Sequence, residues 1–95
     1  MNLTITGRHF EISDDLKKDI EKRVHRFKKY FASIIDVNVI ISREKERYIA
    51  EIILSAKKMI RTTKQENADL HLCLNKATDK IEAQLSHLKD KIKNK

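Results

Sequence analysis

The chain has 95 residues, of which 40% are hydrophobic and 37% charged, so it has enough apolar side chains for one compact core. One Gly and no Pro exclude an obvious linker, and no apolar run approaches the roughly 20 residues that cross a membrane. A net charge of +7 favours a polyanionic partner, either nucleic acid or an anionic membrane surface, with solubility alone as the alternative. These features predict a single domain over residues 1–95.

The N-terminal segment MNLTITGRHFEISDD lacks the basic-then-apolar pattern of a signal peptide. The single Cys73 cannot form an internal disulfide, which together with that segment predicts a cytoplasmic protein. Asn2–Thr6 alternates, with Leu3 and Ile5 on one side, and Gly7 follows as a natural stop. This pattern predicts a short first strand.

A helix is predicted next. Ser13 precedes Asp14 and Asp15, which is typical of an N-cap followed by acids in a first turn. Apolar residues then recur at spacings of four and three, at Leu16, Ile20, Val24, Phe27 and Phe31. The periodicity predicts an amphipathic helix of about five turns.

Two clearly alternating segments follow. Ile34–Arg43 and Arg47–Ala56 are predicted to be strands, joined by a polar turn around Glu44–Glu46. Met59–Lys64 is a weaker third strand of the same meander. Its connection at Lys57–Lys58 is unusual, because two-residue hairpin turns prefer Asn or Gly.

The last predicted element is a long helix. Asn67 is the candidate N-cap, with Asp69 in the first turn. The apolar residues that follow are Leu70, Leu74, Ala77, Ile81, Leu85, Leu88 and Ile92. At 1.5 Å per residue the helix would be about 37 Å long. That length exceeds the width of a four-stranded sheet, about 15 Å between outer strands, so we expect the last turns to project past the core.

The order strand, helix, three strands, helix predicts an α+β domain. Two helices should pack on one face of a four-stranded mixed sheet. A right-handed crossover places the first strand parallel to the second, and the meander continues antiparallel.

The charges of the first helix are unevenly distributed. When each residue is rotated by about 100°, five basic residues fall opposite the apolar stripe, where a solvated face usually mixes signs. They are Lys18, Lys22, His25, Arg26 and Lys29. Arg23 and Tyr30 flank the apolar stripe, and Asp19 and Glu21 lie outside the centre of the basic arc.

A second basic group runs along the last helix. Its members lie within about 60° of arc beside the apolar stripe, and they are Lys76, Lys80, His87 and Lys91. These four residues form a basic strip. The outer side of the helix is expected to carry Asp79, Glu82 and Asp90 mixed with Lys89 and Lys93. Like charges at i and i+4 repel by a few tenths of a kcal/mol, so the strip favours a binding role.

The basic edges of the two helices could line one surface or the groove between them. The rise of about 5–6 Å per helical turn is close to the phosphate repeat of a nucleic-acid strand. Lys and Arg groups at that spacing can meet successive phosphates, which suits a structured RNA recognised by its shape.

Four segments in this order resemble a known family. They are LTITGRHFEISDDLKK at the start, RVHRFKKYF in the first helix, AEI in the third strand and ADLHLCLNKATDKIEAQLSHLKDKIK at the end. Together they resemble the short form of the ribosome hibernation promoting factors, in the wider family of ribosome-associated inhibitor and sigma-54 modulation proteins. The resemblance covers essentially the whole chain. Neither the second domain of the long form nor an acidic tail follows Lys95, which favours the short form.

The resemblance implies a β-α-β-β-β-α fold similar to that of double-stranded RNA-binding domains. It also implies a bacterial protein that binds the small ribosomal subunit in the channel of messenger and transfer RNA. Occupancy of that channel would inhibit translation in stationary phase or stress. The implied partners are ribosomal RNA and, on dimerised ribosomes, ribosome modulation factor.

The implied RNA-contacting residues lie on both helices. The resemblance carries the family's basic positions onto Arg23, Arg26, Lys29, Lys80, Lys89 and Lys91. The charge pattern adds Lys22, Lys76 and His87.

Several positions depart from the family pattern. His71 stands where Tyr is usual, and Ala83 replaces a basic residue in the middle of the last helix. His87 replaces a later basic residue, so one implied contact is missing and another depends on pH.

Two other classes of function are alternatives to RNA binding. No arrangement of catalytic groups predicts an enzyme, and neither a cofactor nor a small-molecule substrate nor a membrane partner is expected. His71 and Cys73 point in different directions on a helix, so no zinc site is expected. The remaining alternative is a generic structured-RNA-binding or dimerising module, with Ile40, Ile49 and Ile53 on the sheet face away from the helices.

Overall fold

The computed structural model describes residues 1–30 and 32–93, with side-chain surroundings as far as His87. The elements follow in the order β1 (Asn2–Arg8), α1 (Asp14–His25), the 3₁₀ helix η1 (Arg26–Lys29), β2 (Ile34–Glu44), β3 (Arg47–Ala56), β4 (Met59–Asn67) and α2 (Leu70–Lys93). This order confirms the α+β prediction.

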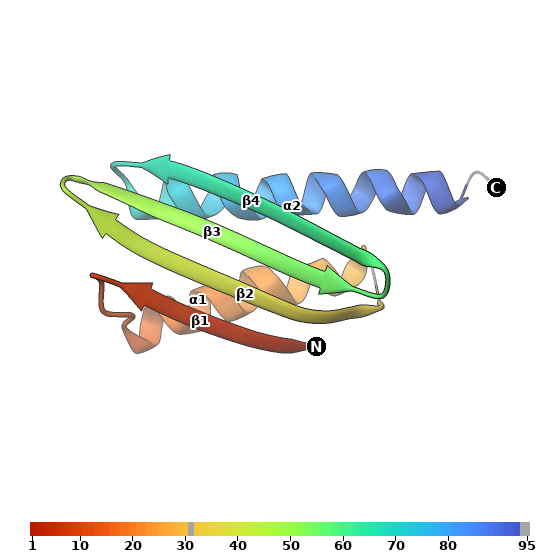
Figure 1. Cartoon of the computed structure of the whole chain (residues 1–95), viewed down its shortest axis with the longest axis horizontal. Helices are drawn as coiled ribbons and strands as arrows, with labels where there is room; N and C mark the ends of the chain where they lie inside the picture. The colour runs from red at the N-terminus through yellow and green to blue at the C-terminus, as the bar shows by residue number, and fades with distance from the viewer. Residues whose placement is uncertain (31, 94–95) are drawn as a thin grey trace.

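The four strands form one mixed sheet in the order β1-β2-β3-β4. β1 pairs parallel to β2, and the β2–β3 and β3–β4 pairs are antiparallel. Figure 1 shows both helices behind the sheet, α1 on the side of β1 and β2 and α2 on the side of β4. The crossover and the placement of both helices on one face agree with the predictions.

The core lies between the sheet and the two helices. Alternate residues of β2 and β3 are fully buried on the helix side, and the two helices add apolar side chains at helical spacing. The main contributors are Val37, Val39 and Ile41 of β2, Ala50, Ile52 and Leu54 of β3, Ile20, Val24 and Phe27 of α1 and η1, and Leu74, Ala77, Ile81 and Leu85 of α2. Burial of each large side chain contributes about 1.5–3 kcal/mol.

The first helix begins as predicted and ends differently. Ser13 Oγ accepts a hydrogen bond from the Leu16 N–H at 3.2 Å, which is an N-cap contact. The α-helical part ends at His25, and the chain continues as η1 through Lys29. Such 3₁₀ tightening is common at helix ends, where it gives otherwise unpaired carbonyl groups a partner. The predicted last apolar position, Phe31, lies outside the described residues.

Gly7 does not end β1, which runs on to Arg8. A Cβ atom at residue 7 would overlap the main-chain oxygen of Phe10 in the loop that follows. Glycine is therefore required by the close approach of that loop, and the prediction that it stops the strand is wrong.

Both hairpins close through two-residue turns that contain no glycine. Lys45 and Lys58 adopt left-handed φ values of 55° and 61°, in the region that favours Gly or Asn. β4 continues to Asn67, beyond the predicted end at Lys64. Main-chain pairing with β3 extends through a polar stretch that the alternation of apolar residues could not reveal.

The long helix α2 starts two residues later than predicted. Asp69 is the capping residue, because its Oδ1 accepts the Leu72 N–H at 3.1 Å and its carbonyl oxygen accepts the Cys73 N–H. Asn67, the predicted cap, instead accepts the Asp69 N–H at 2.8 Å in the preceding turn. Figure 1 shows α2 running past the end of the sheet, as its length predicted.

Candidate nucleic-acid interface

A polar groove separates α1 from α2. Its lining residues on the α1 side are Asp19, Lys22, Arg23 and Arg26, and those on the α2 side are Asn75 and Asp79. The apolar stripes of both helices point to the sheet, so the two helices meet each other mainly through these polar side chains.

Arg23 bridges the two helices across this groove. Its Nε donates to Asp19 Oδ2 at 3.0 Å, and its Nη1 donates to Asn75 Oδ1. The Arg23 side chain is only 16% exposed. Two of its donors are therefore engaged within the protein, and Arg23 serves the packing of the helices.

Arg26 makes a second link between the helices. Its Nη2 lies 2.8 Å from Glu82 Oε1, and the Arg26 side chain is 49% exposed while that of Glu82 is 19% exposed. Glu82 was predicted on the outer side of the last helix with Asp79, but it faces α1. With these two pairs the groove holds basic and acidic groups in similar number. It is therefore not the purely basic channel that would form if the basic edges of both helices lined it.

The outer face of α1 and η1 is basic, as predicted. Lys18, Lys22, His25, Arg26 and Lys29 are all exposed. Their chain spacing places them on the side away from the sheet, where they offer positive charge to a ligand.

The basic strip of Lys76, Lys80, His87 and Lys91 belongs to α2, and we call it the α2 strip. Its described part lies on the far side of α2 from α1. Lys76, Lys80 and His87 are exposed. Lys80 is about 40° of helix rotation from Gln84 and about 160° from Glu82. Gln84 contacts β4, donating to the Thr62 carbonyl oxygen at 3.4 Å.

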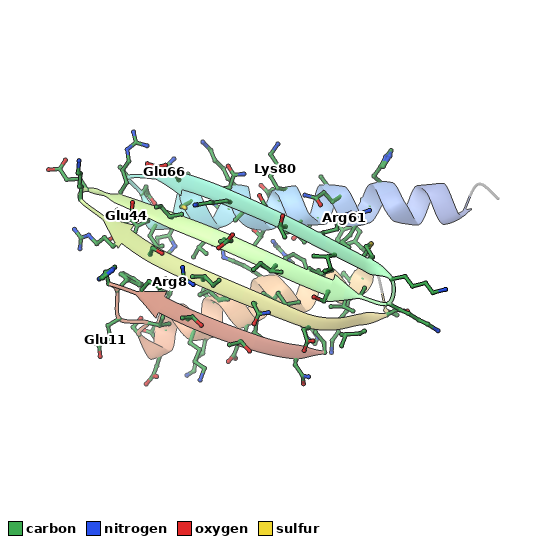
Figure 2. The ribbon with its side chains drawn as sticks, viewed as in Figure 1. Arg8, Glu11, Glu44, Arg61, Glu66 and Lys80 are labelled. Carbon is green, nitrogen blue, oxygen red and sulfur yellow. The ribbon has the colours of Figure 1, made fainter. Side chains whose placement is uncertain are left out.

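Figure 2 shows Lys80 at the edge of the molecule opposite α1. The structure therefore does not bring the α2 strip into the groove between the helices. It separates two basic surfaces, one on α1 with η1 and one on the outer edge of α2. Lys89 and Lys91 lie in the last turns of α2, outside the residues whose side chains are described.

The opposite face of the sheet carries no comparable excess of positive charge. The register places Arg8, Arg47 and Lys64 on it, together with Asp36, Glu44, Glu51 and Glu66. Arg8, Glu44 and Glu66 are labelled at one end of the sheet in Figure 2. The half-buried Ile40, Ile49 and Ile53 lie on this face, as the dimerisation alternative requires. Positive charge is concentrated on the helices.

Cys73 belongs to the core. It is buried, and its Sγ donates to the carbonyl oxygens of Gln65 at 3.2 Å and Tyr48 at 3.5 Å. Burial raises the pKa of its thiol above the ordinary value. Among the described residues, no group of three or more His, Cys, Asp and Glu could hold a metal ion. Within the same residues, no helix combines the length and apolar character needed to cross a bilayer.

The four-stranded sheet, the two helices on one face and their exposed basic surfaces define a small basic α+β domain. The sequence profile of the family described as "Sigma 54 modulation protein / S30EA ribosomal protein" matches residues 3–93. The chain therefore belongs to that family, and the resemblance predicted from the sequence is confirmed.

Curated relatives carry a consistent name. The chain is 29% identical over 93 residues to the ribosome hibernation promoting factor of Salmonella typhimurium, with 98% of both chains covered. It is 28% identical to the factor of Escherichia coli K12, again with 98% coverage. The ribosome hibernation promotion factor of Bacillus subtilis is longer: the match is 25% identical and spans 52% of that protein. The relatives that match the length of this chain are thus ribosome hibernation promoting factors of the short form.

Solved structures share the fold. The N-terminal domain of Thermus thermophilus Protein Y superimposes with a TM-score of 0.86 at 27% identity, covering 93% of this chain and 99% of that domain. A ribosomal subunit interface protein from Coxiella burnetii gives a TM-score of 0.76 at 23% identity, with full coverage of both chains. These likenesses establish the β-α-β-β-β-α architecture.

Proposed function

We propose that this protein is a ribosome hibernation factor that acts in the bacterial cytoplasm. It binds the small ribosomal subunit in the channel of messenger and transfer RNA and inhibits translation during stationary phase or stress. Membership of the family and the names of the relatives support the hibernation role. The site on the small subunit and the setting of stationary phase or stress are the further parts of the proposal, and they follow from the resemblance to the family.

The observation that carries the proposal is the separation of charge between the two sides of the domain. Basic residues are exposed on the outer face of α1 and η1 and on the outer edge of α2, whereas the open face of the sheet balances its charges. Solubility alone would not require this separation. A polyanion in contact with the helices would use it.

Phosphate contacts supply most of the binding in this proposal. Exposed lysines such as Lys22, Lys76 and Lys80 present point charges to the RNA backbone, and Arg26 adds a planar group that can bridge phosphate oxygens. Because the two basic surfaces lie on different sides, each can meet a separate RNA strand. The domain body between them excludes messenger and transfer RNA by its volume. Lys29, Lys89, Lys91 and His87 complete the proposed set, and Arg23 acts by fixing the helices.

The test is sedimentation of the protein with isolated small subunits across a salt series. Each neutralised phosphate contributes about −0.7 to −0.9 to the log–log slope of affinity against salt. The double variant Arg26→Glu/Lys80→Glu should lose most co-sedimentation. Lys64→Glu, an exposed lysine on the open sheet face, is the matched control and should bind nearly as well as the wild type. Unchanged binding of the double variant would rule out the helix surfaces.

A dimerising module is the second candidate, favoured by the half-buried isoleucines Ile40, Ile49 and Ile53 on the open sheet face. Apolar association strengthens or stays level as salt rises, whereas RNA binding weakens steeply. The same salt series, with the mass of the free protein measured by sedimentation, therefore separates the two candidates.

Ribosome modulation factor is the further protein partner we expect on dimerised ribosomes.

A further inference from the structure

We infer that Glu82 is a positioning residue: it holds the guanidinium of Arg26 in the orientation that meets an RNA phosphate. This inference rests on the proposed function, since it assumes that Arg26 contacts ribosomal RNA. It assigns a favourable role in RNA binding to an acidic residue, which charge alone would predict to weaken that binding.

The contact crosses from one helix to the other. Glu82 Oε1 lies 2.8 Å from Arg26 Nη2, at the junction where α1 gives way to η1. Glu82 is mostly buried and Arg26 is half exposed. The fixed partner is thus the carboxylate, and the guanidinium is the part that reaches solvent.

The pair leaves Arg26 able to bind a second anion. Oε1 of Glu82 is buried and receives no aligned hydrogen bond from the described residues, although the ion pair is close. A guanidinium carries five N–H donors in a rigid plane. Its remaining donors stay available on the exposed side, where a phosphate can take two of them.

Two opposite effects decide the sign of Glu82's contribution. Its negative charge repels a phosphate, but this repulsion is weakened because Arg26 already neutralises the carboxylate and because the site borders solvent. Against that, a long side chain that is ordered before binding does not lose its conformational freedom on binding. The ordering effect corresponds to about two- to tenfold in affinity, and we expect it to dominate.

Asp79 supplies a matched comparison. It lies on the same helix and lines the same groove, it is exposed, and within the described side chains it forms no ion pair. Removal of Asp79 therefore removes repulsion without breaking an ion pair among the described side chains. Removal of Glu82 removes repulsion and also releases Arg26.

The experiment measures affinity for isolated small subunits at one moderate salt concentration for the wild type, Glu82→Ala, Glu82→Gln and Asp79→Ala. We expect Glu82→Ala to weaken binding about two- to tenfold although it makes the protein more positive. Glu82→Gln keeps an acceptor oxygen and should retain most of the wild-type affinity. Asp79→Ala should bind more tightly than the wild type. Thermal unfolding establishes that each variant is folded at the temperature of the assay.

The Arg26→Ala background provides the decisive control. There Glu82 has no guanidinium to orient, so adding Glu82→Ala should no longer weaken binding. The inference is overturned if Glu82→Ala and Asp79→Ala both strengthen binding, or if Glu82→Ala weakens binding equally with and without Arg26. A wild-type protein that fails to bind small subunits would instead overturn the proposed function.

Discussion

Arg23 in α1 and Asn75 in α2, 52 positions apart in the sequence, are joined by a hydrogen bond from Arg23 Nη1 to Asn75 Oδ1. The same guanidinium donates to Asp19 one turn earlier in α1. Because both helices direct their apolar stripes at the sheet, this polar bridge and the Arg26–Glu82 pair together help to hold the helices at their distance from each other. The spacing of the two basic surfaces depends on it.

Arg23→Ala should therefore reduce stability by about 1 kcal/mol, the usual net value of a hydrogen bond. Asn75→Ala should have a smaller effect, since Arg23 keeps its pair with Asp19. The double variant should lose less stability than the sum of the two single losses, because the two residues share one interaction. Urea unfolding measures all three. Additive losses would mean that the bridge contributes nothing beyond its separate side chains.

The hairpin turns lead to a second prediction. Lys58 has a left-handed φ of 61°, which costs a residue with a Cβ about 1 kcal/mol relative to glycine. Lys58→Gly should thus stabilise the protein by up to about 1 kcal/mol, and Lys45→Gly should act in the same direction. Lys57→Gly, at the neighbouring turn position without a positive φ, should destabilise it. Denaturant midpoints give the signs, and stabilisation by Lys57→Gly would contradict the assignment of strain to Lys58.

Cys73 makes stability depend on alkaline pH. Burial raises the pKa of its thiol above the ordinary 9.0, so the folded protein holds this proton more tightly than the unfolded chain does. The resulting stabilisation is complete below pH 9.0. It is lost as the pH rises from there through the folded-state pKa.

The measurement compares urea unfolding of the wild type and Cys73→Ala at pH 8 and pH 10. All other side chains are the same in both proteins, so the difference between them isolates the thiol. The wild type should lose more stability than the variant over this interval. Equal losses would mean that Cys73 does not hold its proton more tightly when folded.

Much of this architecture follows from side-chain periodicity. The buried residues Val37, Val39 and Ile41 alternate along β2, and Ile81 and Leu85 recur at helical spacing, so elements and core faces were predictable. End points were less so. Asn67 was the predicted cap of α2, but Asp69 is the cap in the structure. Both residue types are good caps, and only the geometry of the turn selects between them.

The candidate site was predictable only in part, for a geometric reason. Rotation about a helix axis locates each charge relative to the apolar stripe of its own helix, but it does not say which flank faces a neighbouring helix. Lys80 and Glu82 both lie beside the stripe of α2, yet Lys80 lies on the outer edge while Glu82 pairs with Arg26. The sequence did not indicate a role for Asn75, because that role depends on a contact with Arg23 of the other helix.

The exposed Ala83 provides the final prediction. It lies about 20° of helix rotation from Lys76, so a lysine there would join the α2 strip. If the strip contacts phosphates, Ala83→Lys should tighten binding to small subunits and steepen the log–log salt slope by about 0.7–0.9, equivalent to one more phosphate. Alanine and lysine are both good helix formers, so the fold should be unaffected.

Thr62→Lys is the matched control for Ala83→Lys. Thr62 is exposed on the open face of the sheet, opposite Ile53, and its replacement adds the same single charge. A contact at the strip predicts a steeper slope for Ala83→Lys and little change for Thr62→Lys. Equal steepening in both variants would mean that the ribosome responds to overall charge, and the outer edge of α2 would then have no special place in binding.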